Sequence, residues 1–181
     1  MDRFTRYLAD LEAQRAGEEA HERAGEYGER IVEEYAEATL PELLVAARGR
    51  AVTTRVAGLE VSGVIDQVGE DWVLLEVGAG ARALVRISCT EGWEGLPVRR
   101  GQVDRWSRRP VTAALRGLRA EGTPIALVTT TGTVHADVRI AAVGADHVVV
   151  ARTRERRRVV PTRALALVRT GAEDRAGTWS V

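Results

Sequence analysis

The feature that most constrains the fold of this chain is a pattern of two apolar runs that occurs twice. Residues 60–78 read EVSGVIDQVGEDWVLLEVG, and residues 134–152 read VHADVRIAAVGADHVVVAR. In both stretches, two apolar segments of strand length flank a short polar turn, which is typical of a hairpin of antiparallel strands. The sequence therefore predicts one structural unit that the chain builds twice.

Turn glycines align the two copies. Gly58 and Gly69 of the first copy correspond to Gly132 and Gly144 of the second, provided that the second copy holds one extra residue between them. Glycine is favoured at tight turns because it adopts backbone conformations that other residues avoid. Gly63 lies inside a predicted strand, where it permits the sharp bend that a small barrel requires.

A short helix is predicted before each copy. Thr39 is a favourable N-cap residue, and Glu42 follows it by three positions, as in a capping box. Gly49 is a suitable terminator beyond this first helix. The second helix is predicted between Pro110 and Gly122, because proline is favoured in a first turn and glycine beyond a last one.

Five short antiparallel strands are expected after each helix. The clearest segments are 52–56, 61–68 and 72–77 in the first copy, and 134–143 and 147–151 in the second. Strands of this length do not form a stable open sheet by themselves, so we expect each copy to close into a small β-barrel. The predicted fold class is mainly β with additional α-helix.

Five segments follow from this pattern. They are a helical arm at 1–38, a first barrel with its leading helix at 39–98, a basic linker at 99–109, a second barrel with its leading helix at 110–170, and a flexible tail at 171–181. Residues 1–48 hold 12 acidic residues and six arginines, whereas residues 49–181 hold 14 acidic residues and 20 arginines. This asymmetry indicates an acidic arm beside a basic body. All basic residues are arginine, which we attribute to a GC-rich genome.

The order of a helix followed by bent strands, together with VAGLEVSGVIDQVGEDWVLLE at 56–76, resembles the Sm-like family, which includes bacterial Hfq. The resemblance covers about residues 39–91 and 110–169, and it is greatest to an uncharacterised tandem version found in actinobacteria. SH3-like barrels have similar strand patterns. The resemblance implies two small barrels that bind nucleic acid or a protein, in which the fourth strand of one barrel pairs with the fifth strand of a neighbour.

The RNA-contacting residues of the family do not carry over to this chain. The positions that match the Tyr-Lys-His motif of Hfq hold Arg86, Ile87 and Ser88 in the first copy, and Pro161, Thr162 and Arg163 in the second. If the turn is one residue longer here, Trp72 and His147 fall where Hfq has a base-stacking Phe. These two rings are then either stacking platforms or core residues that cap a barrel.

No catalytic group, cofactor site or metal site is predicted. Acidic residues cluster in the first hairpin, but turn geometry alone favours them there. Asp146 and His147 are neighbours on a predicted strand, so we expect their side chains on opposite faces and not as an acid–base pair. The three histidines lack metal-ligand spacing, and Cys89 is expected to be a small core residue. We therefore expect that the protein is not an enzyme.

Arginine-rich segments are the candidate contact surface. The loop RTRERRR holds Arg152, Arg154, Arg156, Arg157 and Arg158, whereas the corresponding stretch of the first copy is the nearly neutral GAGAR. The linker adds Arg99, Arg100, Arg105, Arg108 and Arg109 around Trp106. Basic residues interleaved with an aromatic ring suit a nucleic-acid backbone, and they equally suit an acidic protein. Two functions stay open: an adaptor that contacts an acidic protein, and a regulatory protein that binds RNA or DNA in a salt-dependent, largely sequence-independent way.

We expect the two barrels to pair with each other within one chain, and the protein to be a monomer or a dimer rather than a trimer with a six-barrel ring. Pro161 lacks a backbone donor on the predicted fourth strand of the second copy, and the arginine loop places like charges beside it. No apolar run approaches the roughly 18 residues of a membrane span. The first residues lack a signal-peptide pattern, and Cys89 is the only cysteine. We therefore expect a cytoplasmic protein without a membrane partner.

Overall fold

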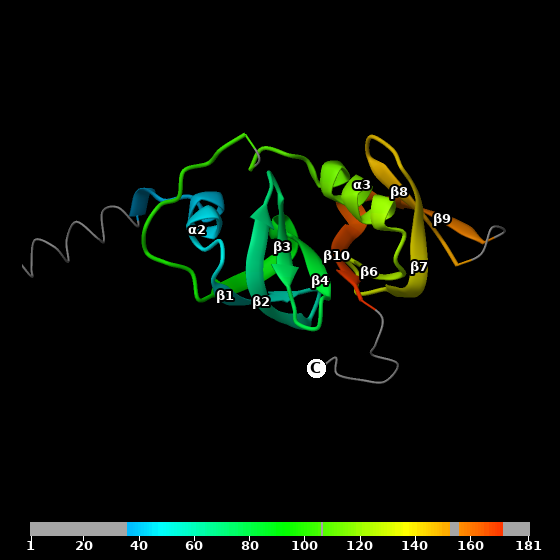
Figure 1. Ribbon diagram of the computed structural model, residues 1–181, viewed down its shortest axis with the longest axis horizontal. Helices are drawn as coiled ribbons and strands as arrows, with labels where there is room; N and C mark the ends of the chain where they lie inside the picture. Colours follow the sequence, from blue (N-terminus) through cyan, green and yellow to red (C-terminus); the bar gives the residue numbers. More distant parts are fainter. Residues whose placement is uncertain (1–35, 106, 153–155, 172–181) are drawn as a thin grey trace, which may run out of the picture.

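The computed structural model describes residues 36–105, 107–152 and 156–171 (Figure 1). Of the predicted helical arm, only residues 36–38 fall in this range, and residues 36 and 37 are helical. The predicted tail lies outside the described residues, apart from Gly171. The described part of the chain contains two complete α-helices and ten strands, so the predicted fold class, mainly β with α, is confirmed.

Both predicted helices are present. Helix α2 spans Leu40–Ala46, and the backbone N–H and the hydroxyl of Thr39 donate to Glu42 Oε2 at 2.8 and 2.9 Å. This is the predicted capping box, which gives partners to polar groups at the start of the helix. Helix α3 spans Val111–Glu121 and ends at Gly122, whose φ of 68° is a left-handed conformation that glycine adopts without steric cost.

The N-terminal half of the sheet follows α2. Its strands are β1 (Ala51–Val56), β2 (Leu59–Val68), β3 (Trp72–Glu76), β4 (Arg82–Arg86) and β5 (Thr90–Glu94), with a 3-10 turn, η1 (Ile87–Cys89), before the last. In space the order is β5-β1-β2-β3-β4, and every neighbouring pair is antiparallel.

The C-terminal half follows α3 and has the same arrangement. Its strands are β6 (Ile125–Thr129), β7 (Val134–Val143), β8 (His147–Ala151), β9 (Arg157–Pro161) and β10 (Leu165–Thr170), with the 3-10 turn η2 (Thr162–Ala164) before the last. Their order is β10-β6-β7-β8-β9, so in both halves the fifth strand borders the first.

The two predicted hairpins are confirmed. Strand β2 pairs with β3, and β7 pairs with β8, in both cases antiparallel. Each hairpin contains a register shift, between Ile65 and Gln67 in the first and between Ile140 and Ala142 in the second. Such shifts bend a strand and increase its twist. At Gly63, a Cβ would lie 2.6 Å from the carbonyl oxygen of Glu76 on β3, so the close approach of the two strands requires glycine there.

The two halves join through β4 and β10, which pair antiparallel from Val85 opposite Leu167 to Arg82 opposite Thr170. The predicted pairing between the copies is therefore present, and it covers backbone groups that a sheet edge would leave open. The ten strands follow one continuous order with β5 and β9 at its ends, so the structure shows a single antiparallel sheet, and closure of each half into a barrel stays a prediction. Figure 1 shows α2 toward one end of this sheet and β9 at the other.

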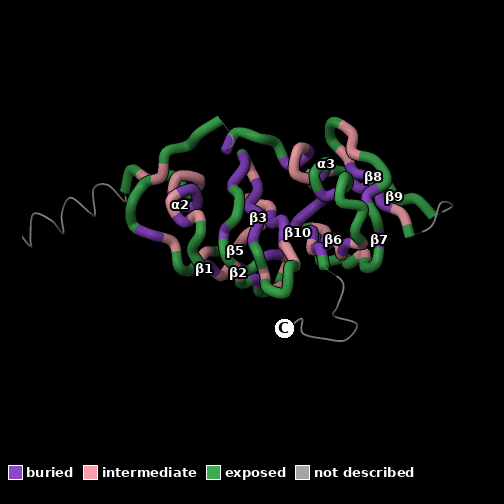
Figure 2. Tube along the Cα trace, viewed as in Figure 1, coloured by how far each residue is buried: buried purple, intermediate pink, exposed green. Residues whose placement is uncertain are grey.

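The hydrophobic core is shared between the halves. One cluster, built mainly from β1 to β4, also contains Val128, Ala166 and Leu167 of the C-terminal half. The other cluster, built mainly from α3 and β6 to β10, contains Trp72 and Leu84 of the N-terminal half. Figure 2 shows the buried segments concentrated in the middle of the molecule, where β3 and β10 lie. Within the described residues, no helix has the length and apolar composition needed to cross a bilayer.

Candidate anion-binding site

A β-bulge in β7 shapes the candidate site. Ile125 of β6 faces Val138 of β7, whereas Leu127 faces His135, so β7 carries one residue more than β6 over this stretch. Asp137 lies at the bulge with a φ of 55°, a left-handed conformation that aspartate tolerates better than most residues. Strands β1 and β2 pair without such a shift. The bulge therefore accounts for the extra residue that the glycine spacing requires in the second copy.

Arg152 follows β8 and lies against the bulge. Its Nε and Nη2 atoms both donate to the carbonyl oxygen of Ala136, at 3.2 and 3.1 Å. A bulge leaves backbone groups out of the strand ladder, and here the guanidinium gives one of them a partner. Because this contact already restricts the side chain, Arg152 loses less entropy when it binds a ligand.

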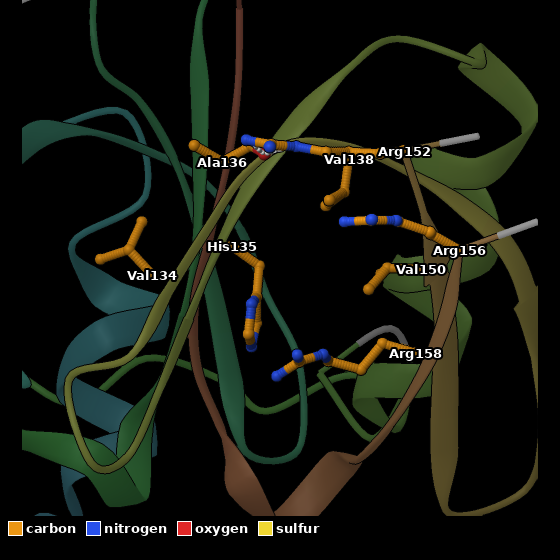
Figure 3. Close-up of a pocket in the computed structure, with 8 residues that line it drawn as sticks. All are labelled: Val134, His135, Ala136, Val138, Val150, Arg152, Arg156 and Arg158. Atoms are coloured by element: carbon orange, nitrogen blue, oxygen red, sulfur yellow. Dashed lines mark hydrogen bonds between the residues drawn. The ribbon is translucent and has the colours of Figure 1, made fainter.

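Two further arginines reach the same place from β9 and the residue before it. Successive side chains on a strand point to opposite faces, so Arg156 and Arg158 share one side while Arg157 points to the other. Figure 3 shows Arg156 and Arg158 extending toward β7, from which His135 projects to meet them. The residue at which β9 begins thus determines that Arg156 and Arg158 lie on the same side, facing the cleft.

These residues surround a cleft of about 280 Å³, which we call the arginine cleft. It is lined by Val134, His135, Ala136, Val138, Val150, Arg152, Arg156 and Arg158. Among the described residues, no acidic side chain belongs to this lining. Arginine remains protonated at physiological pH, so these three side chains keep their positive charge. Val138 and Val150 are 7% and 2% exposed and give the cleft an apolar part.

The imidazole of His135 adds no fourth charge. Burial lowers the pKa of His135 below its usual value of 6.5, and the nearby Arg158 cation lowers it further. The ring is therefore neutral at pH 7, where it presents an aromatic surface together with one donor and one acceptor nitrogen.

The structure does not bring the linker arginines to the cleft. Arg100 forms ion pairs with Glu37 and Glu42 at 3.4 and 2.9 Å, so acidic residues before and within α2 balance its charge. Four more candidates, Arg99, Arg105, Arg108 and Arg109, are not among the residues that line the cleft. Arg154 and Trp106 lie outside the described residues.

The two candidate stacking rings have different environments. Trp72 is 3% exposed, and its indole N–H donates to the carbonyl oxygen of Arg109 at 2.8 Å, so its burial fits a core residue rather than a platform for a base. The His147 side chain is 42% exposed, and its Nδ1 lies 2.9 Å from Asp146 Oδ1. The expectation that these two side chains point apart is wrong, because Asp146 lies in the turn before β8 and not on the strand. The hydrogen bond to His147 lowers the pKa of Asp146.

Sequence reasoning does not single out His135 or Val134, although both line the cleft. The available signal is the extra residue of the second copy, but no glycine marks its position along the strand. Elsewhere in the described part of the chain, no group of three or more His, Cys, Asp or Glu side chains is placed to hold a metal ion. Cys89 is half-buried, with its Sγ 3.8 Å from the carbonyl oxygen of Leu165.

A comparison of the chain with known protein families finds no family model that matches, and a comparison with curated proteins finds no significant relative.

Proposed function

We propose that this chain is a non-catalytic binding module that holds an acidic partner in the arginine cleft. The observation that carries the proposal is the gathering of Arg152, Arg156 and Arg158 around one cleft whose described lining contains no acidic side chain. Like charges at short range repel one another, and an anion that enters relieves this repulsion. The partner therefore gains affinity from charge that the fold has already brought together.

We further propose that the two halves of the sheet are two Sm-like barrels in tandem. Three features support a repeated unit: the same strand order in both halves, register shifts at corresponding places, and a short helix before each first strand. The arginine cleft lies in the second unit, whose arginine loop corresponds to the short turn at 78–81 of the first unit.

A regulatory protein that binds RNA or DNA is the second candidate. The observation that favours it is the neutral His135 ring and the valines beside the three cations, since single-stranded nucleic acids are held by cations together with surfaces on which bases stack. An adaptor for an acidic protein uses the cations alone.

Binding of two labelled polyanions, a poly-glutamate peptide and a single-stranded oligonucleotide, tests the proposal by fluorescence anisotropy. We expect at least one of them to bind, with an affinity that falls as salt rises. The double variant R156S/R158S should weaken binding by about tenfold or more, because it removes two charge-assisted contacts. All of these arginines are exposed, so the variants should remain folded.

The matched control is R50S/R157S, which removes the same charge from exposed positions outside the cleft lining. We expect this variant to bind within about twofold of the unmodified chain, since only general electrostatic attraction is reduced. Equal losses in the two double variants would contradict a role for the cleft. Failure of both polyanions to bind would overturn the proposed function.

A further inference from the structure

The arginine cleft has a cationic side and an apolar side. Its cations are Arg152, Arg156 and Arg158, and its apolar contacts come from valines on β7 and β8. Figure 3 shows Val138 and Val150 among the guanidinium groups, so one ligand reaches both kinds of surface. A ligand that fills this cleft should therefore carry an anionic group next to an apolar body.

Three cations around a small cleft attract a doubly charged anion more strongly than a single carboxylate. A phosphate monoester carries about −1.5 to −2 at pH 7 and presents three acceptor oxygens. A carboxylate, or a phosphodiester within a strand, carries a single charge. The planar N–H pairs of arginine match phosphate oxygens in a bidentate arrangement. The cationic side therefore suits a terminal phosphate best.

Arg152 is prepared for such a contact. The Ala136 carbonyl oxygen holds its Nε and one N–H of Nη2, at 3.2 and 3.1 Å, and the other N–H groups of the guanidinium stay available for a ligand. The phosphate therefore meets one cation that is already positioned, in addition to Arg156 and Arg158.

The apolar side suits a flat ring. Val138 and Val150 are buried in the wall of the cleft, and the His135 ring lies beside them (Figure 3). The His135 ring is neutral at pH 7 because burial and the Arg158 cation lower its pKa. Inorganic phosphate or a phosphorylated serine leaves these groups uncovered, whereas a nucleotide base stacks on such a surface.

The volume of the cleft further limits which ligands it can hold. The volume of about 280 Å³ lies just below the roughly 300–1,000 Å³ that is usual for small-molecule pockets. A cleft of this size accepts a single nucleotide and excludes a duplex.

We propose that the arginine cleft binds one nucleotide unit that carries a phosphate monoester, with the phosphate on Arg152, Arg156 and Arg158 and the base against His135. This inference rests on the proposed function, and it commits that function to a nucleotide rather than an acidic peptide. The same chemistry occurs in a free mononucleotide and at the 5′-phosphorylated end of a strand.

Isothermal titration calorimetry of the full chain with adenosine 5′-monophosphate, adenosine and inorganic phosphate tests the proposal. The monophosphate should bind about tenfold or more tightly than either of the other two, because each of those lacks one half of the contacts. Arg158→Ser should weaken binding of the monophosphate by about tenfold. The Arg157 side chain points away from the cleft, so Arg157→Ser is the matched control. It should change the affinity for the monophosphate by about twofold or less.

A second pair of variants separates the base from the phosphate. His135→Ala should weaken binding of the monophosphate severalfold but leave the affinity for inorganic phosphate unchanged. Val134→Ser, on the opposite face of β7, is the matched control and should change neither affinity. If both ligands lose affinity equally in His135→Ala, His135 does not contact a base, and the nucleotide assignment is overturned.

Two adenylate hexanucleotides, one with a 5′-phosphate and one with a 5′-hydroxyl, distinguish the source of the nucleotide. Tighter binding of the 5′-phosphorylated strand than of the free monophosphate assigns the cleft to strand ends, and the reverse order assigns it to a free nucleotide. Equal binding of the two hexanucleotides would contradict the need for a phosphate monoester, because the internal phosphodiesters would then be sufficient for binding. If a polyanion binds through Arg156 and Arg158 but adenosine 5′-monophosphate does not bind, the inference fails while the proposed function stands.

Discussion

At the scale of single residues, Trp72 and His147 follow turn glycines at the same distance, and each ring lies against its glycine. A Cβ on Gly69 would lie 2.1 Å from the Trp72 indole, and a Cβ on Gly144 would lie 2.4 Å from the His147 imidazole. The rings differ in their freedom to move. Trp72 is buried and hydrogen-bonded to Arg109, whereas the His147 side chain is 42% exposed.

We therefore expect Gly69→Ala to lower the free energy of unfolding by about 1–3 kcal/mol, because the added methyl group overpacks a site that the indole cannot leave. Gly144→Ala is the matched control. It should cost about 0.5 kcal/mol or less, since the His147 ring can move toward solvent. Urea unfolding followed by circular dichroism measures both values, and equal losses would contradict the argument from burial.

At the scale of elements, α2 depends on a charged cap. Hydrogen bonds from the Thr39 backbone and then from the Arg100 guanidinium hold the pKa of Glu42 at about 2, below its usual 4.5. A carboxyl group whose pKa is lower in the folded than in the unfolded state stabilises the fold at pH values above its unfolded pKa. This contribution is lost as the pH falls from about 4.5 to about 2.

Glu42→Gln should consequently lower the thermal unfolding temperature at pH 6, and the difference from the unmodified chain should shrink as the pH approaches 2. Asp104 also has a pKa near 2, held there mainly by Ser107, but it is present in both proteins and cancels in the comparison. Thermal melts at several pH values measure the effect. A difference that stays constant between pH 6 and pH 2.5 would show that the charge of Glu42 does not stabilise the fold.

The elements that the sequence predicts well are those with local signals. Strands β2, β3, β7 and β8 have apolar runs between polar turns, and their observed bounds differ from the predicted ones by no more than two residues. The joining of all ten strands into one sheet has no such local signal. It depends on how closely β4 and β10 approach each other in space.

The candidate site is likewise predicted only in those features that have a local sequence signal. Charge clustering identifies the arginines of the loop, but the face that each one occupies depends on where β9 begins. His135 borders the cleft beside a bulge, and one extra residue can be accommodated at several places along a strand with little trace in the sequence. Sequence therefore predicts the charge of the site and not its shape.

At the scale of the whole molecule, the two ends of the sheet differ from its centre. Strands β4 and β10 are buried along most of their length, whereas β9 and β5 carry mainly exposed or half-buried residues. Ile65 of the first copy corresponds to Ile140 of the second, 75 residues later. The same offset aligns β4 with β9, and β5 with β10. In the register of the β4–β10 pair, β9 of one chain would place Arg158 opposite Glu94 and Val159 opposite Trp93 on β5 of another.

Pro161 would fall outside that register, because it corresponds to Arg86, so the missing donor does not prevent such a contact. What opposes it is the small apolar area: Val159 and Trp93 alone would be covered, far from the roughly 1,000 Å² of a stable interface. We therefore expect light scattering at micromolar concentration to give the 19.7 kDa of one chain, or at most twice that mass. Val159→Lys should leave this mass unchanged. A mass of three chains that falls in the Val159→Lys variant would contradict the expectation and show that β9 and β5 pair between molecules.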